Sequence, residues 1–168
     1  MKKLYIIRHA KSSWEDGSLK DQDRPLNKRG QRDAPIMAEH FLGEEERVHM
    51  LVSSPAVRAL STCKIFAKAL KYPTNAITIA NEIYGASVDQ MMQLINSWND
   101  EWDTVCIFGH NPTFTYLAER LCNINIGNLP TCGIVGIEFE SNQWQAVSLG
   151  NGTQIFYDYP KNHNQGNN

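Results

Sequence analysis

Short apolar runs alternate with helix-like segments along most of the chain, and this alternation is the strongest constraint on the fold. The runs lie at 4–7, 48–52, 76–80 and 104–108. Apolar residues recur at helical spacing over 28–43, 55–70, 88–98 and 115–122. Strands that alternate with helices favour a mostly parallel sheet covered on both faces. The pattern therefore predicts an α/β protein, a three-layer α/β/α sandwich with a mostly parallel central sheet.

The last third of the sequence has a different pattern. Two further apolar stretches, 134–139 and 144–149, predict a hairpin that turns at 140–143. Residues 161–168 are polar and rich in asparagine, which predicts a mobile tail. A chain of 168 residues has the usual size of one domain. We therefore expect a single domain over 1–160.

The composition excludes several classes of protein. Sixteen Lys and Arg face eighteen Asp and Glu, a net charge of -2, whereas a broad nucleic-acid surface usually has a large basic excess. The apolar runs are too short for a signal peptide or a membrane span. The four cysteines form no C-x-x-C pair and are interpreted as small buried hydrophobic residues. These features predict a cytoplasmic protein that binds neither nucleic acid nor membranes.

Charged or titratable side chains follow three of the apolar runs. Arg8 and His9 follow the first run, Arg58 lies after the second, and His110 follows the fourth. The carboxyl ends of parallel strands meet at one edge of a sheet, where ligands bind. Each residue alone has a plain structural explanation, such as a hydrogen-bonded histidine or a solvated arginine. Together they predict a pocket for a phosphoryl group, because arginine binds phosphate oxygens in a bidentate manner.

The same residues predict how the pocket would react. Histidine attacks phosphorus only through an unprotonated ring nitrogen, and the charges of Arg8 and Arg58 favour the neutral form of His9. Predicted helix starts near Pro55 and Pro112 add backbone N–H donors. A metal site is the competing chemistry, but the sequence contains no H-x-x-x-H or H-E-x-x-H spacing and no acidic cluster beside either histidine. We expect no metal and no nucleotide cofactor.

Four sequence blocks contain these residues: Arg8-His9-Ala10, 23–30 (DRPLNKRG), 53–62 (SSPAVRALST) and 109–112 (GHNP). In this order they resemble the motifs of the histidine phosphatase superfamily, which includes the phosphoglycerate mutases. Ala10 replaces the commoner glycine of the Arg-His-Gly signature. The resemblance covers most of the chain and implies a phosphoglycerate-mutase-like fold. The short length and the Gly-His-Asn-Pro form are similar to the SixA-type phosphohistidine phosphatases.

The resemblance also implies roles for the pocket residues. His9 would carry a covalent phosphoryl group, and Arg8, Arg58 and His110 would hold that group without a metal or organic cofactor. Asn111, beside the second histidine, is a further candidate for binding the phosphoryl group.

Two residues of the long polar loop 11–29 have open roles. Arg24 either reaches the phosphoryl pocket or pairs with a loop carboxylate such as Asp23. Ser12 either matches a small hydroxyl residue that follows the signature in larger members, or is a simple turn residue. A loop of this length in a compact domain usually has a function.

Glu82 is the candidate general acid. It follows the third apolar run, in a place similar to that of a catalytic glutamate in larger members of the superfamily. An alkoxide leaving group must be protonated by an acid close to the bridging oxygen, whereas imidazole is a better leaving group and needs the acid less. Glu82 can equally be a solvent-facing residue, so its role would decide the class of substrate.

Three functions remain open from the sequence. The first is a phosphatase for phosphohistidine in proteins, because a compact chain has little material for a lid over the pocket. The second is a phosphomonoesterase for a small phosphorylated metabolite, favoured by a working Glu82 and a pocket walled by Trp14 or Tyr84. The third is a non-catalytic phosphate-binding module. In the first two functions, His9 displaces the leaving group and water then hydrolyses the phosphohistidine.

Overall fold

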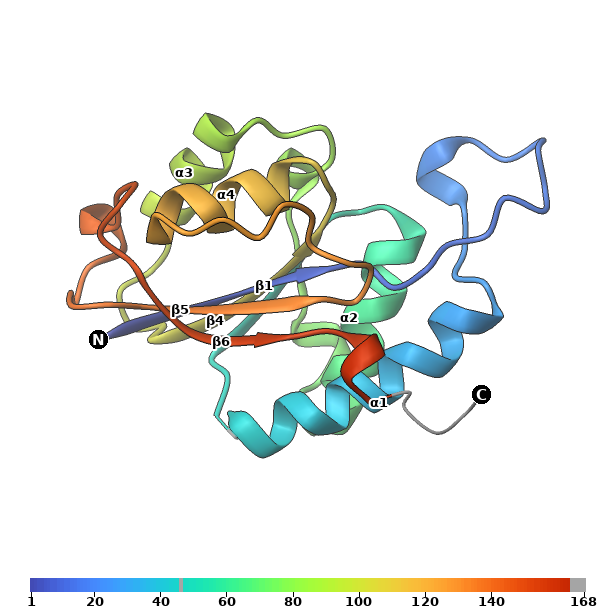
Figure 1. The fold of residues 1–168 in the computed structure, drawn as a ribbon, viewed down its shortest axis with the longest axis horizontal. Helices are drawn as coiled ribbons and strands as arrows, with labels where there is room; N and C mark the ends of the chain where they lie inside the picture. The colour runs from blue at the N-terminus through green and yellow to red at the C-terminus, as the bar shows by residue number, and fades with distance from the viewer. Residues whose placement is uncertain (46, 164–168) are drawn as a thin grey trace.

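The computed structural model describes residues 1–45 and 47–163, and its elements follow the expected alternation (Figure 1). The strands are β1 (Lys2–Arg8), β2 (Met50–Ser53), β3 (Thr78–Ile79), β4 (Thr104–Gly109), β5 (Ile134–Phe139) and β6 (Thr153–Asp158). The α-helices are α1 (Lys28–Glu44), α2 (Val57–Ala69), α3 (Val88–Asn96) and α4 (Thr113–Cys122). The described residues contain no helix long and apolar enough to cross a membrane.

The six strands form one sheet in the order β3-β2-β4-β1-β5-β6. The pairs β1–β4, β4–β2 and β2–β3 are parallel, whereas β5 runs antiparallel to both of its neighbours. This order places β1 in the middle of the sheet, between β4 and β5. The mostly parallel sheet predicted from the sequence is confirmed.

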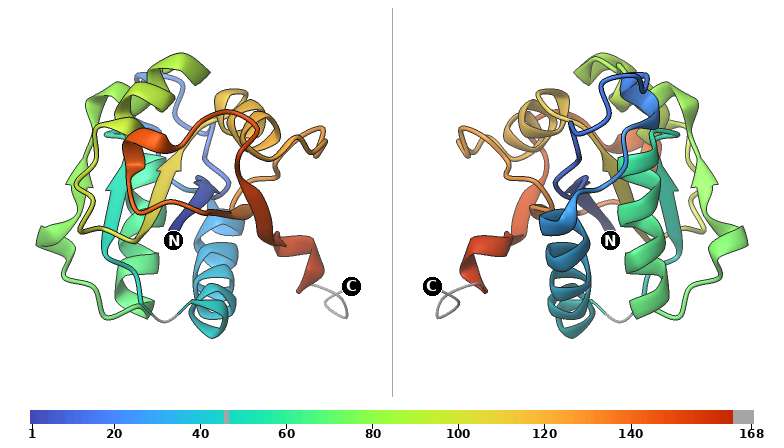
Figure 2. Two further views of the ribbon diagram at one scale, coloured as in Figure 1. Left: turned by 90° about the vertical axis from the view of Figure 1, so that its left-hand side faces the viewer. Right: turned by 90° about the vertical axis from the view of Figure 1, so that its right-hand side faces the viewer.

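The two faces of the sheet are covered by different helices, which gives the three layers seen in Figure 2. Successive side chains of a strand point to opposite faces. Leu4 and Ile6 of β1 therefore belong to a core with α3 and α4, and Tyr5 and Ile7 belong to a second core with α1 and α2. The predicted α/β/α sandwich is confirmed.

Only the first strand of the predicted hairpin is confirmed. Its first strand is β5, but the second strand of the pair is β6, at 153–158, and 144–149 is not a strand. Trp144 is fully buried at the start of a short 3₁₀ helix. Its indole Nε1 donates to the carbonyl of Trp102 at 2.7 Å, and its backbone N donates to a carboxylate oxygen of Asp100 at 2.8 Å. These contacts hold 144–146 against a neighbouring loop instead of against β5.

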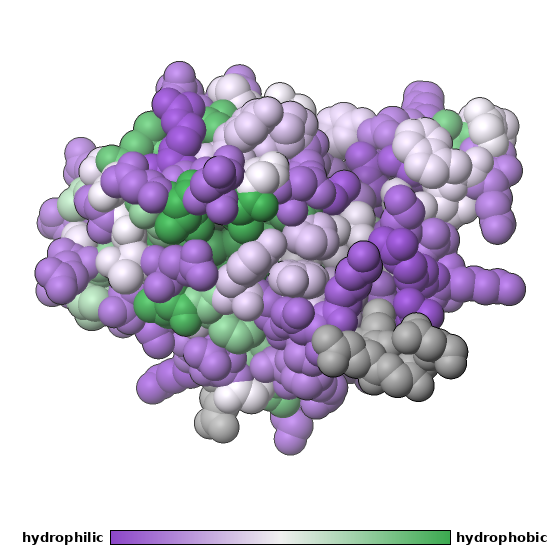
Figure 3. All heavy atoms as spheres, in the orientation of Figure 1, coloured by the Kyte–Doolittle hydropathy of each residue, from purple (hydrophilic) through white to green (hydrophobic). Residues whose placement is uncertain are grey.

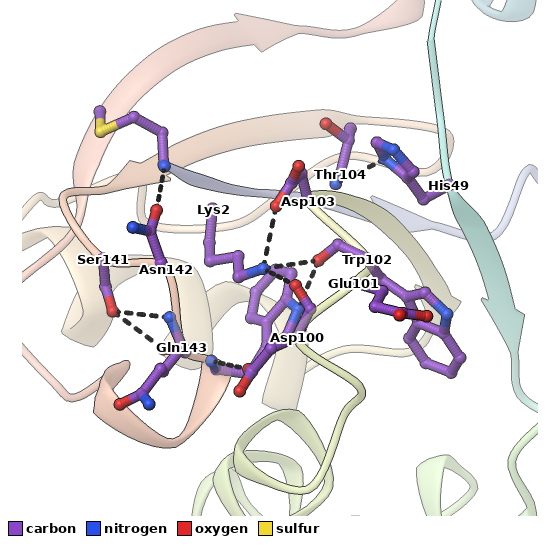
Figure 4. Close-up of polar contacts among 12 residues, drawn as sticks. Lys2, His49, Asp100, Glu101, Trp102, Asp103, Thr104, Ser141, Asn142 and Gln143 are labelled. Carbon is purple, nitrogen blue, oxygen red and sulfur yellow. Dashed lines mark hydrogen bonds and ion pairs between the residues drawn. The ribbon is translucent and has the colours of Figure 1, made fainter.

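A cluster that we call the Lys2 anchor joins the start of β1 to this region (Figure 4). It consists of Lys2, Asp100, Trp102, Asp103 and Trp144. The Lys2 ammonium is fully buried and donates to the carbonyls of Asp100 and Trp102 and to the carboxylate of Asp103. An ammonium has three N–H donors, so every donor of Lys2 is satisfied. The anchor fixes the loops that precede β4 and β6.

The long loop after β1 projects from the molecule and carries mainly hydrophilic side chains (Figures 1 and 3). It folds back on itself, because Ser12 pairs with Leu26 and the N of Asn27 donates to the carbonyl of Lys11 at 3.0 Å. Asn27 also caps α1 by accepting from the N of Gly30 at 2.9 Å. A Cβ at Gly30 would lie 2.2 Å from the Lys11 carbonyl oxygen, so only glycine fits there. The loop is therefore tied down at both ends.

Smaller predictions need correction. The helix predicted to start near Pro55 is α2, which begins at Val57 with Ala56 as its N-cap and no capping side chain. The third strand has only two residues. Residues 161–163 are not a free tail, since His163 bonds to the Asp158 carboxylate at 2.7 Å. Residues 164–168 of the predicted tail lie outside the described residues.

Candidate active site

The parallel register of the sheet brings the strand-end residues together. Arg8 of β1 pairs with Gly109 of β4, so His9 and His110 follow at neighbouring positions. The backbone N of His9 donates to the carbonyl of Gly109 at 3.0 Å, and the centroids of the two imidazole rings are 5.3 Å apart. At the end of β2, the N of Ser54 donates to a carbonyl of β4 at 3.0 Å. The predicted convergence of both histidines at one edge is observed.

The protonation of His9 follows from its surroundings. Its Nδ1 lies 2.7 Å from the carbonyl oxygen of Ala10, and a carbonyl can only accept, so Nδ1 carries the proton. Burial lowers the pKa of the His9 imidazole to about 3, with smaller contributions from His110, Arg58 and Arg8. The ring is therefore neutral near pH 7 and Nε2 has a free lone pair. The sequence prediction named the arginines as the cause, whereas burial is the larger one.

Arg8 and Asn111 share one backbone acceptor. The Nη1 of Arg8 and the Nδ2 of Asn111 each donate to the carbonyl of Leu129 at 2.9 Å. The amide oxygen of Asn111 accepts from the backbone N and the hydroxyl of Thr115. The Asn111 side chain thus links β4, α4 and the loop around Leu129, and it holds the carbonyl that orients Arg8. These contacts support an orienting role for Asn111 alongside its place in the pocket.

Arg58 comes from the first turn of α2 and is buried. Its Nη1 donates to the backbone carbonyl of Asp21 at 2.7 Å, and its Nη2 donates to the Asp21 carboxylate at 2.9 Å. The hydroxyl of Tyr84 donates to the same carboxylate at 2.6 Å. The Tyr84 hydrogen bond, with Arg58 next, holds the pKa of the Asp21 carboxyl well below its usual range. Asp21 is therefore a fixed negative charge beside Arg58.

His110 is held by a hydroxyl group. Its Nε2 lies 2.8 Å from the Oγ of Ser54. Burial, followed by the charge of Arg58, lowers the pKa of the His110 imidazole to about 4. The preceding Gly109 is required by close packing, because a Cβ there would lie 2.5 Å from the ring of Phe114. His110 is thus neutral and fixed in place.

Three buried side-chain nitrogens of the described residues have no hydrogen-bond partner there, and all three belong to this group. They are Nε of Arg8, Nε of Arg58 and Nδ1 of His110. Buried polar groups are nearly always paired, so each exception needs an explanation. Two guanidinium donors and an imidazole nitrogen beside a neutral His9 are suited to an anionic ligand with several oxygens.

The structure shows which groups the two loop residues with open roles contact. Arg24 is buried, and its Nε donates to the Asp21 carboxylate at 3.2 Å. Its Nη1 donates to the Oγ of Ser12 at 2.9 Å, and its guanidinium stacks 3.5 Å from the centroid of the exposed Trp14 ring. The predicted loop carboxylate is therefore Asp21 and not Asp23. Ser12 and Arg24 hold the loop in a position that presents Asp21 to Arg58.

Glu82 and His110 line different cavities. A cavity of about 480 Å³ is lined by Asp21, Arg58, Tyr84, His110 and Asn111, among others. Glu82 is exposed and lines a second cavity of about 460 Å³, with residues of α3. Tyr84 lines both cavities and its ring packs edge-on against His110 at 5.6 Å. The structure does not bring Glu82 to the pocket where His110 lies.

Sequence reasoning missed three groups that support the site. Asp21 and Ser54 were not singled out as partners of Arg58 and His110. Thr62 was noted only as part of a motif, yet its hydroxyl accepts from the N of Ala10 at 3.0 Å and donates to the carbonyl of Arg58 at 2.7 Å. Thr62 thus ties the end of β1 to α2. For Thr62 and Ser54, membership of the 53–62 block was an available signal; for Asp21 the only signal was its spacing of three residues from Arg24. Among the described residues, no group of three or more potential ligands could hold a metal ion.

Comparisons with known proteins find similar sequences and similar folds. The family model described as histidine phosphatase superfamily (branch 1) matches residues 4–102. An uncharacterized chloroplastic protein of Arabidopsis thaliana is 28% identical over 86% of this chain and 69% of its own length. The phosphohistidine phosphatase SixA of Escherichia coli is 24% identical over 71% of this chain and 73% of its own. A solved structure of the protein histidine phosphatase SixA with tungstate has a TM-score of 0.81 at 22% identity, covering 95% of this chain and 98% of that one.

Proposed function

This chain belongs to the histidine phosphatase superfamily and is a hydrolase of that family, and we propose that it removes phosphoryl groups from phosphohistidine in proteins through a covalent intermediate on His9. The observation that carries the proposal is the set of three unpartnered nitrogens, from Arg8, Arg58 and His110, around a neutral histidine. The solved SixA structure with tungstate, a tetrahedral oxyanion, supports an oxyanion as the ligand.

In the first step, Nε2 of His9 attacks phosphorus. Its lone pair is available because the proton is on Nδ1, where the Ala10 carbonyl holds it. The free Nε–H donors of Arg8 and Arg58 bind the phosphoryl oxygens as charge develops on them. A Ser54 hydroxyl that donates to Nε2 of His110 leaves Nδ1 of that ring protonated as a third donor. The bond between phosphorus and the substrate breaks in line with the attack.

In the second step, water hydrolyses the phosphohistidine. The same donors hold the oxygens, and the bond between phosphorus and Nε2 breaks. Phosphorylated His9 carries a proton on Nδ1, so Nε2 leaves as part of a neutral imidazole. Neither step requires a metal ion or an organic cofactor.

The nature of the leaving group favours phosphohistidine over a small phosphate ester as the substrate. The carboxylate nearest to the pocket, Asp21, is held ionised, and Glu82 lines another cavity. An alkoxide would leave without a nearby acid, whereas imidazole needs none. The second candidate remains a phosphomonoesterase for a small metabolite, because a cavity of about 480 Å³ has the size of a small-molecule site.

The test compares phosphate release from a histidine-phosphorylated protein and from p-nitrophenyl phosphate, in excess chelator. The wild type, His9→Ala and Glu82→Gln are assayed in parallel. We expect turnover of the phosphohistidine that is lost in His9→Ala and retained in Glu82→Gln. Acid-labile phosphate trapped on the wild type and missing from His9→Ala would identify the intermediate.

Two results would reject the proposal. Ester hydrolysis that is faster than phosphohistidine hydrolysis and collapses in Glu82→Gln would establish the metabolite phosphatase. Phosphate binding without turnover of either substrate would establish a binding module.

A further inference from the structure

Asp21 is an unexpected group in a pocket built for an anion. It lies in the short 3₁₀ helix Asp21–Asp23 of the projecting loop, and it lines the same cavity as His110. Its carboxylate accepts from Arg58, Tyr84 and Arg24. A negative charge next to a phosphate site lowers the affinity for phosphate, so its presence needs a compensating function.

The contacts of Asp21 leave the phosphoryl donors free. A guanidinium has five N–H donors, and Asp21 occupies two of those of Arg58, one with its backbone and one with its side chain. The Nε–H of Arg58 remains unpartnered. A phosphoryl group and Asp21 can therefore bind different edges of the same guanidinium. The carboxylate does not have to leave when substrate binds.

The carboxylate also retains room for one more donor. Two carboxylate oxygens offer about four acceptor positions. Oδ2 accepts from Arg58 and Tyr84, and Oδ1 accepts from Arg24. The Asp21 side chain is 48% exposed, so a group that enters the cavity from solvent can reach the remaining position on Oδ1.

We propose that Asp21 is a specificity-determining residue that accepts an N–H from the leaving group, and so selects phosphorus–nitrogen bonds over phosphorus–oxygen bonds. This inference rests on the proposed function. It adds that the selection comes from a fixed charge on the enzyme and not only from the better leaving ability of imidazole.

The proton balance of the transfer agrees with this role. The substrate ring carries phosphorus on one nitrogen and a proton on the other, and this cationic ring donates to Asp21. When Nε2 of His9 attacks, the P–N bond of the substrate breaks and its electron pair stays on the substrate nitrogen. The substrate leaves as neutral imidazole, and the positive charge passes to the phosphorylated His9 ring. An ester offers no such N–H, and an anionic metabolite would meet the charge of Asp21.

The test uses Asp21→Asn, with Asp23→Asn as the matched control in the same 3₁₀ helix. The side chain of Asp23 is exposed. Each protein is assayed with free phosphohistidine and with p-nitrophenyl phosphate, and inorganic phosphate is used as a competitive inhibitor. We expect Asp21→Asn to lower kcat/KM for phosphohistidine about 10-fold or more. Turnover of p-nitrophenyl phosphate and inhibition by phosphate should be unchanged or stronger, and Asp23→Asn should resemble the wild type.

Failure of this inference and failure of the proposed function would give different results. Equal losses on both substrates in Asp21→Asn, together with weaker inhibition by phosphate, would show that Asp21 only orients Arg58 and would overturn this inference alone. An unchanged preference between the two substrates would also overturn it. A wild type that does not hydrolyse phosphohistidine would overturn the proposed function, and this inference with it.

Discussion

The buried cations at the two ends of β1 differ in how completely their N–H donors are hydrogen-bonded. At its start, the three N–H donors of Lys2 have three acceptors in the Lys2 anchor. At its end, the cations Arg8 and Arg58 each have a buried Nε without a partner in the described part of the chain. A satisfied buried charge contributes to the fold, whereas an unsatisfied one costs stability unless a ligand completes it. The difference separates a structural cluster from the proposed binding site within one strand.

The largest effect should come from removing a cation at the active end. Arg8→Met should lower kcat/KM for phosphohistidine about 100-fold or more, because a donor to the phosphoryl oxygens is lost. Its free energy of unfolding should change by less than about 1 kcal/mol, since an incompletely paired charge is removed. Turnover and urea denaturation of the same preparation test both statements. A large loss of stability would make Arg8 a structural residue like Lys2.

The converse variant is Lys2→Met, at the other end of the strand. It removes the donor to the Asp100 carbonyl and should cost about 2–4 kcal/mol in the free energy of unfolding. The ion pair with Asp103 adds little, because that carboxylate is 60% exposed. Where the variant remains folded, kcat/KM should stay within about twofold of the wild type. Inactivation without unfolding would contradict the separation of the two ends.

Acidification should lower the free energy of unfolding through the protonation of His9 and His110. His9 and His110 have pKa values of about 3 and about 4 in the fold, below the ordinary value of about 6.5. The unfolded chain therefore binds more protons below about pH 6.5, and stability is lost as the pH falls toward the folded values. Each histidine adds at most about 1.4 kcal/mol per pH unit.

Two variants sharpen this pH test. His110→Asn should lower the slope of unfolding free energy against pH, between about pH 6 and about pH 5, to roughly half. Lys2→Met should keep the slope of the wild type, because its lost contacts do not involve either histidine. Equal slopes in wild type and His110→Asn, measured by urea denaturation, would show that His110 does not cause the acid sensitivity.

The smallest effect should come from Glu82→Gln. The residue is exposed and lines the cavity beside α3, so kcat/KM for phosphohistidine should remain within about twofold of the wild type. The same preparation should show an unchanged ratio of phosphohistidine to ester turnover. A selective loss of ester turnover would mean that Glu82 moves into the pocket as an acid.

Local patterns predicted the elements that lie in the middle of the sheet. The runs that became β1, β2 and β4 are buried on both faces and therefore read as continuous apolar segments. The edge of the sheet was harder to predict. Residues 144–149 form no strand, and Trp144 instead packs from a short 3₁₀ helix into the core that contains residues of α3. A short apolar stretch does not show which neighbour will bury it.

The sequence by itself determined the alternation of the first four strands with the helices, and with it the meeting of Arg8, His9, Arg58 and His110 at one edge. That much depends on chain connectivity and on the direction of parallel strands. Only the tertiary structure decided that Asp21 faces Arg58 and that Glu82 faces another cavity. Both residues lie in loops and 3₁₀ turns, where no periodicity fixes the direction of a side chain. There, contacts with distant residues such as Tyr84 select the conformation.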